Sequence, residues 1–189
     1  VIPFETEYTY SPDIAAGDEM VYTKGENGYG ERVYDVLYVD GVEEERTLVR
    51  ESLEKEPITE ELGTGWRSPL ISPLDFDWKF CKEGEPIGAS KVLRNQRSSA
   101  YSAREGAKTA SGRNAVVGHV AVNPNVIPYG SKLFIQSEDG RYIYGYCVAA
   151  DTGLALMDGR VAVDIFYDTY GESVQHGIRQ VDIFVLETP

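Results

Sequence analysis

The chain has 189 residues, of which 42% are hydrophobic and 26% charged, a balance that fits one large soluble domain or two small ones. Its net charge of -13 disfavours duplex nucleic acid as a partner, because such binding needs cations that neutralise phosphates. No apolar run reaches the roughly 18 residues that span a bilayer. The chain also does not open on a basic and then apolar segment, so neither a membrane span nor a signal peptide is predicted.

The charge is unevenly distributed along the chain. Residues 1–80 hold 19 acidic and 7 basic side chains, a balance of -12, whereas residues 81–189 hold 12 acidic and 11 basic ones, a balance of -1. This asymmetry indicates two units with different surfaces. Seven Lys and Arg residues lie between positions 82 and 113. That stretch either faces an anionic polymer such as a cell wall or forms a solvated linker.

Residues 1–66 are predicted to form a small elongated antiparallel sheet. The run FETEYTY alternates apolar and polar residues, as do ERVYDVLYV and EERTLVRES. The last two runs are joined by Asp40-Gly41, a dipeptide typical of tight hairpin turns. A segment this acidic, with few large aliphatic residues, is expected to have only a slight core.

An irregular connector is predicted for residues 67–91, where prolines and glycines interrupt any period. Phe76, Trp78 and Phe80 occupy alternate positions in it. Such residues are rare in disordered linkers. We therefore expect them to pack against a neighbouring domain as one short strand.

Residues 92–189 are predicted to form a compact β-barrel. The predicted strands are HVAVN, KLFIQS, YIYGYCVAA, RVAVDIFY and QVDIFVLE, with turns at Asp139-Gly140 and Asp158-Gly159. One short helix is expected in DTYGESVQHG, with Asp168 as its N-cap and Gly177 at its end. The fold class is therefore mainly β.

The order of motifs in residues 92–189 resembles that of the 3D (three-aspartate) domain of Gram-positive wall proteins. These motifs are SSAYSA, TASG, VGHVAVNPNVIPYGSKLFI, YCVAADTG, GRVAVDIFYD and HGIRQVDIFVL. The family is related to the catalytic barrel of membrane-bound lytic transglycosylase A. The resemblance implies a double-psi β-barrel that cleaves peptidoglycan glycan strands.

Residues 1–66, which end in KEPITEELGTG, resemble a G5 (G-five) domain, an extracellular module that commonly precedes wall-degrading domains. Together the two resemblances imply an extracellular, cell-wall-associated monomer. Its partner would be peptidoglycan glycan strands, and no cofactor or metal is expected.

The resemblance also implies the site. Two of the three family aspartates fall on Asp151 and Asp164, and the third falls on Asn123, which cannot exchange a proton. The DTG-to-Asp spacing is two residues longer than expected. Asp164, in the apolar strand VAVDIF, is the proposed general acid/base that forms anhydro-muropeptides, with Asp151 as its electrostatic partner. Substrate contacts are expected from five residues: Tyr101, Thr109, Asn123, Thr152 and Gly153.

Simpler interpretations stand beside these roles. An Asp before Thr-Gly is often only a turn former. The two histidines, His119 and His176, are expected to be structural, and no ligand spacing indicates a metal site. Cys81 and Cys147 either form a disulfide or remain free thiols.

Three other functions compete with the transglycosylase. A pair of carboxylates can also activate water and hydrolyse the glycan. An aspartic protease shares the DTG tripeptide, but it requires two such loops and a late apolar-apolar-Gly run that this chain lacks. A wall-glycan-binding module without activity is favoured by Asn123 and by the longer link after Asp151.

Overall fold

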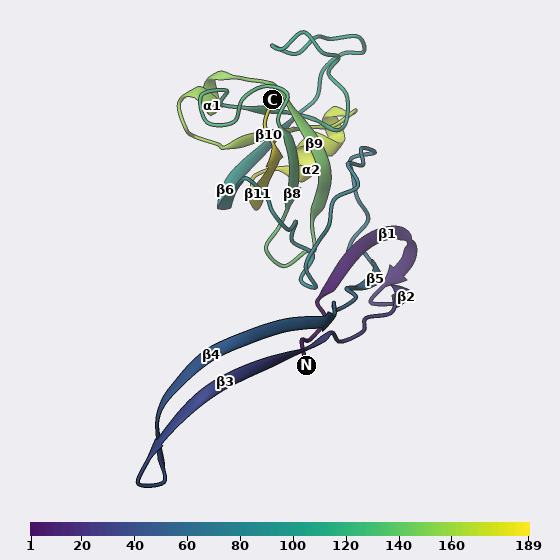
Figure 1. Cartoon of the computed structure of the whole chain (residues 1–189). Helices are drawn as coiled ribbons and strands as arrows, with labels where there is room; N and C mark the ends of the chain where they lie inside the picture. Colours follow the sequence, from purple (N-terminus) through teal and green to yellow (C-terminus); the bar gives the residue numbers. More distant parts are fainter.

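A computed structural model describes residues 1–189, apart from the side chains of Pro12 and Ala16. Two small sheets at the N-terminal end are followed by an irregular connector and a closed six-stranded barrel (Figure 1). The predicted mainly β fold class is confirmed. The elements are β1 (Thr6–Ala16), β2 (Glu19–Thr23), β3 (Tyr29–Val39), β4 (Val42–Lys55), β5 (Glu60–Gly65), β6 (Lys91–Tyr101), β7 (His119–Val122), β8 (Lys132–Gln136), β9 (Ile143–Asp151), α1 (Leu154–Met157), β10 (Val163–Phe166), α2 (Tyr170–His176) and β11 (Arg179–Glu187).

The N-terminal part consists of a three-stranded sheet and a separate hairpin. In the sheet, β5 lies between β1, which runs parallel to it, and β2, which runs antiparallel. The predicted hairpin is confirmed as β3 and β4, a long ribbon that extends away from the barrel in Figure 1. Its turn places Asp40 and Gly41 at positive φ of 51° and 81°, as a two-residue primed turn requires. Both strands are mostly exposed, so the slight core expected here is confirmed.

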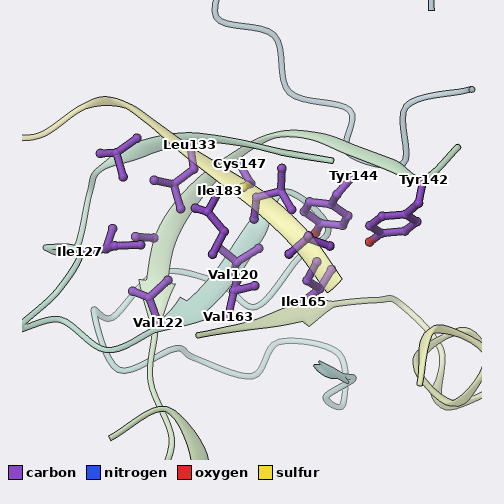
Figure 2. Close-up of a cluster of buried hydrophobic side chains, with 14 of the residues drawn as sticks. Val120, Val122, Ile127, Leu133, Tyr142, Tyr144, Cys147, Val163, Ile165 and Ile183 are labelled. Atoms are coloured by element: carbon purple, nitrogen blue, oxygen red, sulfur yellow. The ribbon is translucent and has the colours of Figure 1, made fainter. Parts of the chain in front are cut away.

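The barrel closes in the order β10-β6-β11-β8-β9-β7. The pairs β6–β10 and β7–β9 are parallel and the others antiparallel. Alternate residues of every strand point inward and fill the interior, among them Val120, Val163 and Ile183 (Figure 2). The five strands predicted for this region are confirmed.

Two barrel elements were not predicted, and one cap was assigned to the wrong residue. Strand β6, with the sequence KVLRNQRSSAY, shows no clean apolar alternation, because most of its residues are polar and only Ser98 is fully buried. Helix α1 has only four residues. Asp168 is not the N-cap of α2: Thr169 caps the helix by accepting from the Glu172 amide, and the Glu172 carboxylate accepts from Thr169 in return.

The connector packs on the outer face of β8, β9 and β11. Phe80 is only 1% exposed, and Phe76 and Trp78 pack on the same apolar cluster, so the predicted docking is confirmed. The predicted short strand is wrong, because only isolated bridges form, such as the one between Phe80 and Tyr8. Asp77 interrupts any extended run with a φ of 51°.

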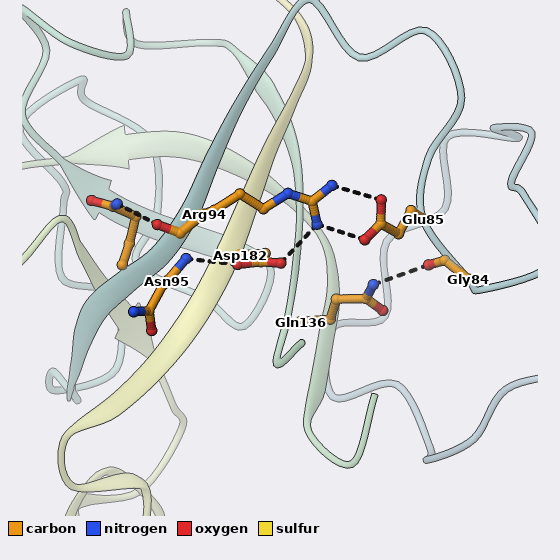
Figure 3. A network of polar contacts seen from close by, with 7 residues as sticks. Gly84, Glu85, Arg94, Asn95, Gln136 and Asp182 are labelled. Atoms are coloured by element: carbon orange, nitrogen blue, oxygen red, sulfur yellow. Dashed lines mark hydrogen bonds and ion pairs between the residues drawn. The ribbon is translucent and has the colours of Figure 1, made fainter. Parts of the chain in front are cut away.

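A polar network fixes the end of the connector to the barrel (Figure 3). Arg94 of β6 donates to Glu85 at 2.7 Å and to the buried Asp182 of β11 at 2.8 Å. The amide of Asn95 donates to the other oxygen of Asp182. Because both oxygens of this buried carboxylate accept hydrogen bonds, the free-energy cost of removing it from water is offset.

The remaining predictions concern cysteines, histidines and membrane segments. Cys81 and Cys147 are both free thiols, which decides between the two alternatives. His176 is buried with its ring nitrogens 3.0 Å from Ser98 Oγ and 3.2 Å from Tyr167 Oη, and the His119 ring contacts the Asn114 carbonyl. Within the part of the chain that the structure describes, no helix is long and apolar enough to cross a membrane.

Candidate functional site

Strand pairing brings the two predicted aspartates to one region of the barrel. Strand β7 lies between β9 and β10, and its residue Ala121 is the register partner of both Asp151 and Asp164. Adjacent strands lie about 4.8 Å apart, so the two aspartate backbones are separated by about 10 Å. Two residues 13 positions apart in sequence therefore flank a single alanine, which is buried against Leu156 and Val161.

Asp164 projects from the outside of the barrel. Its neighbours Val163 and Ile165 point into the interior, and strand alternation turns Asp164 the other way. It is half-buried on the outer face, beside the Ser99 of β6 with which it is in register.

The Asp164 carboxyl has one occupied oxygen and an environment that favours its protonated form. Ser99 Oγ donates to its Oδ1 at 2.9 Å, and among the described residues no hydrogen bond to Oδ2 is found. Burial raises the pKa of Asp164 above its ordinary value, the Ser99 hydrogen bond lowers it, and the negative charge of Asp151 raises it. The net direction is upward, as a proton donor requires.

Asp151 is held in a different way, because both of its oxygens accept hydrogen bonds. Oδ1 accepts from the amides of Ala110 and Thr152 at 2.8 and 2.9 Å, and Oδ2 accepts from Tyr101 Oη at 3.1 Å. These three donors fix the orientation of the carboxylate. Asp151 thus places a fixed negative charge near Asp164 and also pins the loop that contains Ala110.

Tyr101 is hydrogen-bonded to Asp151 and lies near the charge of Asp164. Its pKa is raised above the ordinary value by burial first, then by the charge of Asp151, the hydrogen bond to it and the charge of Asp164. The phenol therefore stays protonated and donates. Its ring packs edge-on against Phe166, with the ring centroids 5.2 Å apart.

The other predicted site residues are not all directed at this pair. Thr109 is buried, and its hydroxyl lies 3.2 Å from Ser111 Oγ and donates to the Arg113 carbonyl, so it shapes the loop. Thr152 Oγ1 is buried and is left without a hydrogen-bond partner among the described atoms. Gly153 is exposed just before α1, with open space where a Cβ would stand.

Asn123 makes no hydrogen bond to either aspartate among the described residues. Its side chain accepts from the Asn125 amide at 3.0 Å and donates to the Leu156 carbonyl at 3.5 Å. It lines a cavity of about 260 Å³ whose walls contain neither aspartate. Hydrogen bonds connect Asp151 to Tyr101 and to the loop that contains Thr109 and Ala110. Among the described residues, Asn123 takes no part in this group.

Two functional groups were missed at the level of sequence. Ser99 was part of the motif SSAYSA but was not singled out, although its position two residues before Tyr101 places both on the same strand face. The backbone amide of Ala110 carries no side-chain signal at all. Its hydrogen bond to Asp151 follows only from the folded loop.

Family comparisons agree with both halves of this architecture. Residues 1–65 match the model of the G5 domain, and residues 118–187 match the model of the 3D domain. The chain contains a G5 domain followed by a 3D domain. The 3D match includes Asp151, Asp164 and Asn123 and begins after β6.

Two relatives from Bacillus subtilis (strain 168) are similar over parts of the chain. The cell wall-binding protein YocH is 34% identical over 105 residues, covering 52% of this chain and 33% of the relative. YabE, provisionally designated a cell wall shaping protein, is 37% identical over 67 residues, covering 35% of this chain and 14% of the relative. The chain therefore spans a third or less of the length of these relatives.

Among solved structures, the crystal structure of MltA from E. coli is 23% identical, with a TM-score of 0.37, over 44% of this chain and 28% of MltA. The E. coli MltA structure with bound chitohexaose gives 22% identity and the same TM-score, over 45% of this chain and 29% of that one.

Proposed function

We propose that the protein is a cell-wall enzyme that cleaves the MurNAc–GlcNAc bond of peptidoglycan as a lytic transglycosylase, with Asp164 as its general acid and base. The 3D domain and the names of YocH and YabE support a role at the cell wall. The observation that carries the catalytic proposal is the contrast between two neighbouring carboxyls. Asp164 has a raised pKa and one oxygen not engaged by the described residues, whereas Asp151 is held by three donors.

The reaction uses one carboxyl twice. Protonated Asp164 gives its proton to the glycosidic oxygen as the bond from the muramyl C1 breaks. The resulting carboxylate then takes the proton of the muramyl 6-hydroxyl as O6 bonds to C1, which closes a 1,6-anhydro ring. The fixed charge of Asp151 stabilises positive charge that develops at C1. No water is consumed, and Asp164 ends in the state in which it began.

Product analysis tests this proposal. Incubation of the protein with purified peptidoglycan is expected to release anhydro-muropeptides, detected by mass spectrometry. Muropeptides with reducing ends would instead show hydrolysis by activated water. Tight binding without any released product would establish the second candidate, a wall-glycan-binding module.

The second candidate is favoured by one specific position. Asn123 replaces the family aspartate and lies outside the hydrogen-bonded group of Tyr101 and Asp151. An Asn123→Asp variant is expected to release more anhydro-muropeptide than the wild type if the missing carboxylate limits the rate. It would release none if the protein only binds glycan.

Ser99 is a positioning residue whose effect is visible in the pH dependence. Its hydroxyl donates to Asp164 and lowers that pKa, so Ser99→Ala is expected to raise the pKa further. Asp164 must be protonated to act as the acid, so activity falls as pH rises through its pKa. The descending limb of the pH–rate profile should therefore move to higher pH in Ser99→Ala. Ser99→Thr keeps the hydroxyl, so the descending part of its pH–rate profile should match that of the wild type. If the profile of Ser99→Ala also matched the wild type, Ser99 would have no positioning role.

A further inference from the structure

We propose that a cavity of about 260 Å³ next to the strand that carries Asp164 is a subsite for a carboxylate carried on a side branch of the glycan. The inference rests on the proposed function, because it extends the site of Asp164 along the same barrel face. Three segments form the cavity: β6, the loop after β7, and the turn between α1 and β10. Its lining residues are Leu93, Gln96, Arg97, Asn123, Val126, Ile127, Leu156, Gly159, Arg160, Val161 and Ala162.

The parallel strands β6 and β10 connect the lining of the cavity to the proposed acid/base. Ser99 and Asp164 are register partners, and two residues earlier on each strand stand Arg97 and Ala162. The Ala162 amide donates to the Arg97 carbonyl at 2.8 Å, which continues the pairing. Since a strand rises about 3.3 Å per residue and alternate side chains share a face, Arg97 lies about 7 Å from Ser99 on the outer face.

Two guanidinium groups line the cavity, and carboxylates do not fully neutralise them. Among the described side chains Arg97 takes part in no ion pair, and it is exposed. Arg160 pairs only with Asp158, at 3.4 Å, and both of these side chains are more than 60% exposed. Such a surface pair is weak and exchanges readily. Planar guanidinium groups bind carboxylates through paired hydrogen bonds, so an anionic branch fits this end of the cavity.

The remaining walls are apolar and suit the carbon skeleton of such a branch. Leu156 and Ile127 are buried, and Val126 is 48% exposed at the rim. An unbranched neutral glycan would offer a carboxylate to neither guanidinium group. The cavity therefore selects an acid-bearing sugar over an uncharged one, which is a distinction that Asp164 and Asp151 alone do not make.

Peptidoglycan carries a carboxylate on a side branch in two forms. The lactyl arm of the muramyl sugar ends in a free carboxylate once its peptide has been removed, and otherwise the attached peptide carries carboxylates of its own. Three ligands separate these cases: glycan fragments that retain peptides, the same fragments after amidase treatment, and neutral chitohexaose.

Calorimetric titration of these ligands into the Asp164→Asn variant measures binding without turnover. We expect at least one of the two carboxylate-bearing glycans to bind more tightly than chitohexaose. Whichever of these two binds more tightly shows whether the carboxylate comes from the peptide or from the lactyl arm. Adding Arg97→Gln and Arg160→Gln should weaken that ligand by about 10–100-fold, the worth of hydrogen bonds to a charged group, and leave chitohexaose unchanged. Arg141→Gln is the matched control, because its side chain is 89% exposed in the turn between β8 and β9 and lies outside this cavity.

Equal affinity for charged and neutral glycans, or an unchanged affinity in the double arginine variant, would overturn the subsite. Neither outcome depends on catalysis. If the wild type released no anhydro-muropeptide but the arginine variants still lost affinity, the proposed reaction would fail and the carboxylate subsite would stand.

Discussion

Asp164→Asn is expected to reduce the release of anhydro-muropeptides from purified peptidoglycan by about 10²–10⁴-fold, the usual contribution of a general acid or base. The amide is nearly the same size as the carboxyl and can still accept from Ser99 Oγ, so the local packing is retained. What it cannot do is give a proton to the glycosidic oxygen and later accept one from the 6-hydroxyl. Initial rates from chromatographically separated muropeptides measure the loss.

The matched control is Asp168→Asn, which makes the same carboxyl-to-amide change four residues later at an exposed position. Its rate should equal that of the wild type. Asp164→Asn should also bind insoluble peptidoglycan as well as the wild type in a pelleting assay, since the change affects proton transfer. If Asp164→Asn retained wild-type activity, the acid/base role would be lost, and the cell-wall role would then rest on binding alone.

Asp151→Asn is expected to act differently from Asp164→Asn. An amide at position 151 has only one acceptor oxygen for three donors, so the contacts to Tyr101 and to the Ala110 loop cannot all persist. The expected result combines lower activity with a lower free energy of unfolding. The two aspartates therefore serve unequal purposes, with Asp164 in the reaction and Asp151 in holding the site.

Sequence alone predicted most of the fold because the patterns were local. Val120 and Val122, or Val163 and Ile165, alternate with outward-facing residues, and that period of two identifies barrel strands directly. The hairpin followed from Asp40-Gly41, where positive φ at both positions limits the choice of residues. These features require no knowledge of distant contacts.

The parts that were missed depend on contacts between distant segments. Strand β6 carries polar side chains on one face and is a strand because β10 and β11 pair with it on either side. Nothing in the motif DTG reveals that the Ala110 amide, 41 residues earlier, occupies an oxygen of Asp151. Asn123 follows β7 as the motif predicts, yet α1, which was not predicted, provides the carbonyl that fixes its side chain.

Phe80→Ala is expected to lower the free energy of unfolding by about 3–5 kcal/mol, the usual cost of emptying a large buried aromatic site. Phe80 is 1% exposed, and its ring lies between 5.0 and 6.1 Å from those of Tyr10, Trp66, Phe134 and Tyr146. Its backbone also exchanges two hydrogen bonds with Tyr8 of β1. One side chain therefore joins the N-terminal sheet, the connector and the barrel.

The barrel depends on this junction because its β8, β9 and β11 face is apolar on the outside as well as the inside. Without the docked connector, Phe134, Tyr146 and Phe184 would meet water. Urea denaturation followed by tryptophan fluorescence measures the effect where it arises, since Trp66 and Trp78, the two tryptophans of the chain, both lie in this cluster. Phe76→Ala is the matched control: the same truncation at a half-buried ring, tilted against the ring of Tyr146, should cost clearly less. Equal losses of unfolding free energy in the two variants would show that Phe80 contributes only the apolar surface that it buries, and that it does not hold the two domains together.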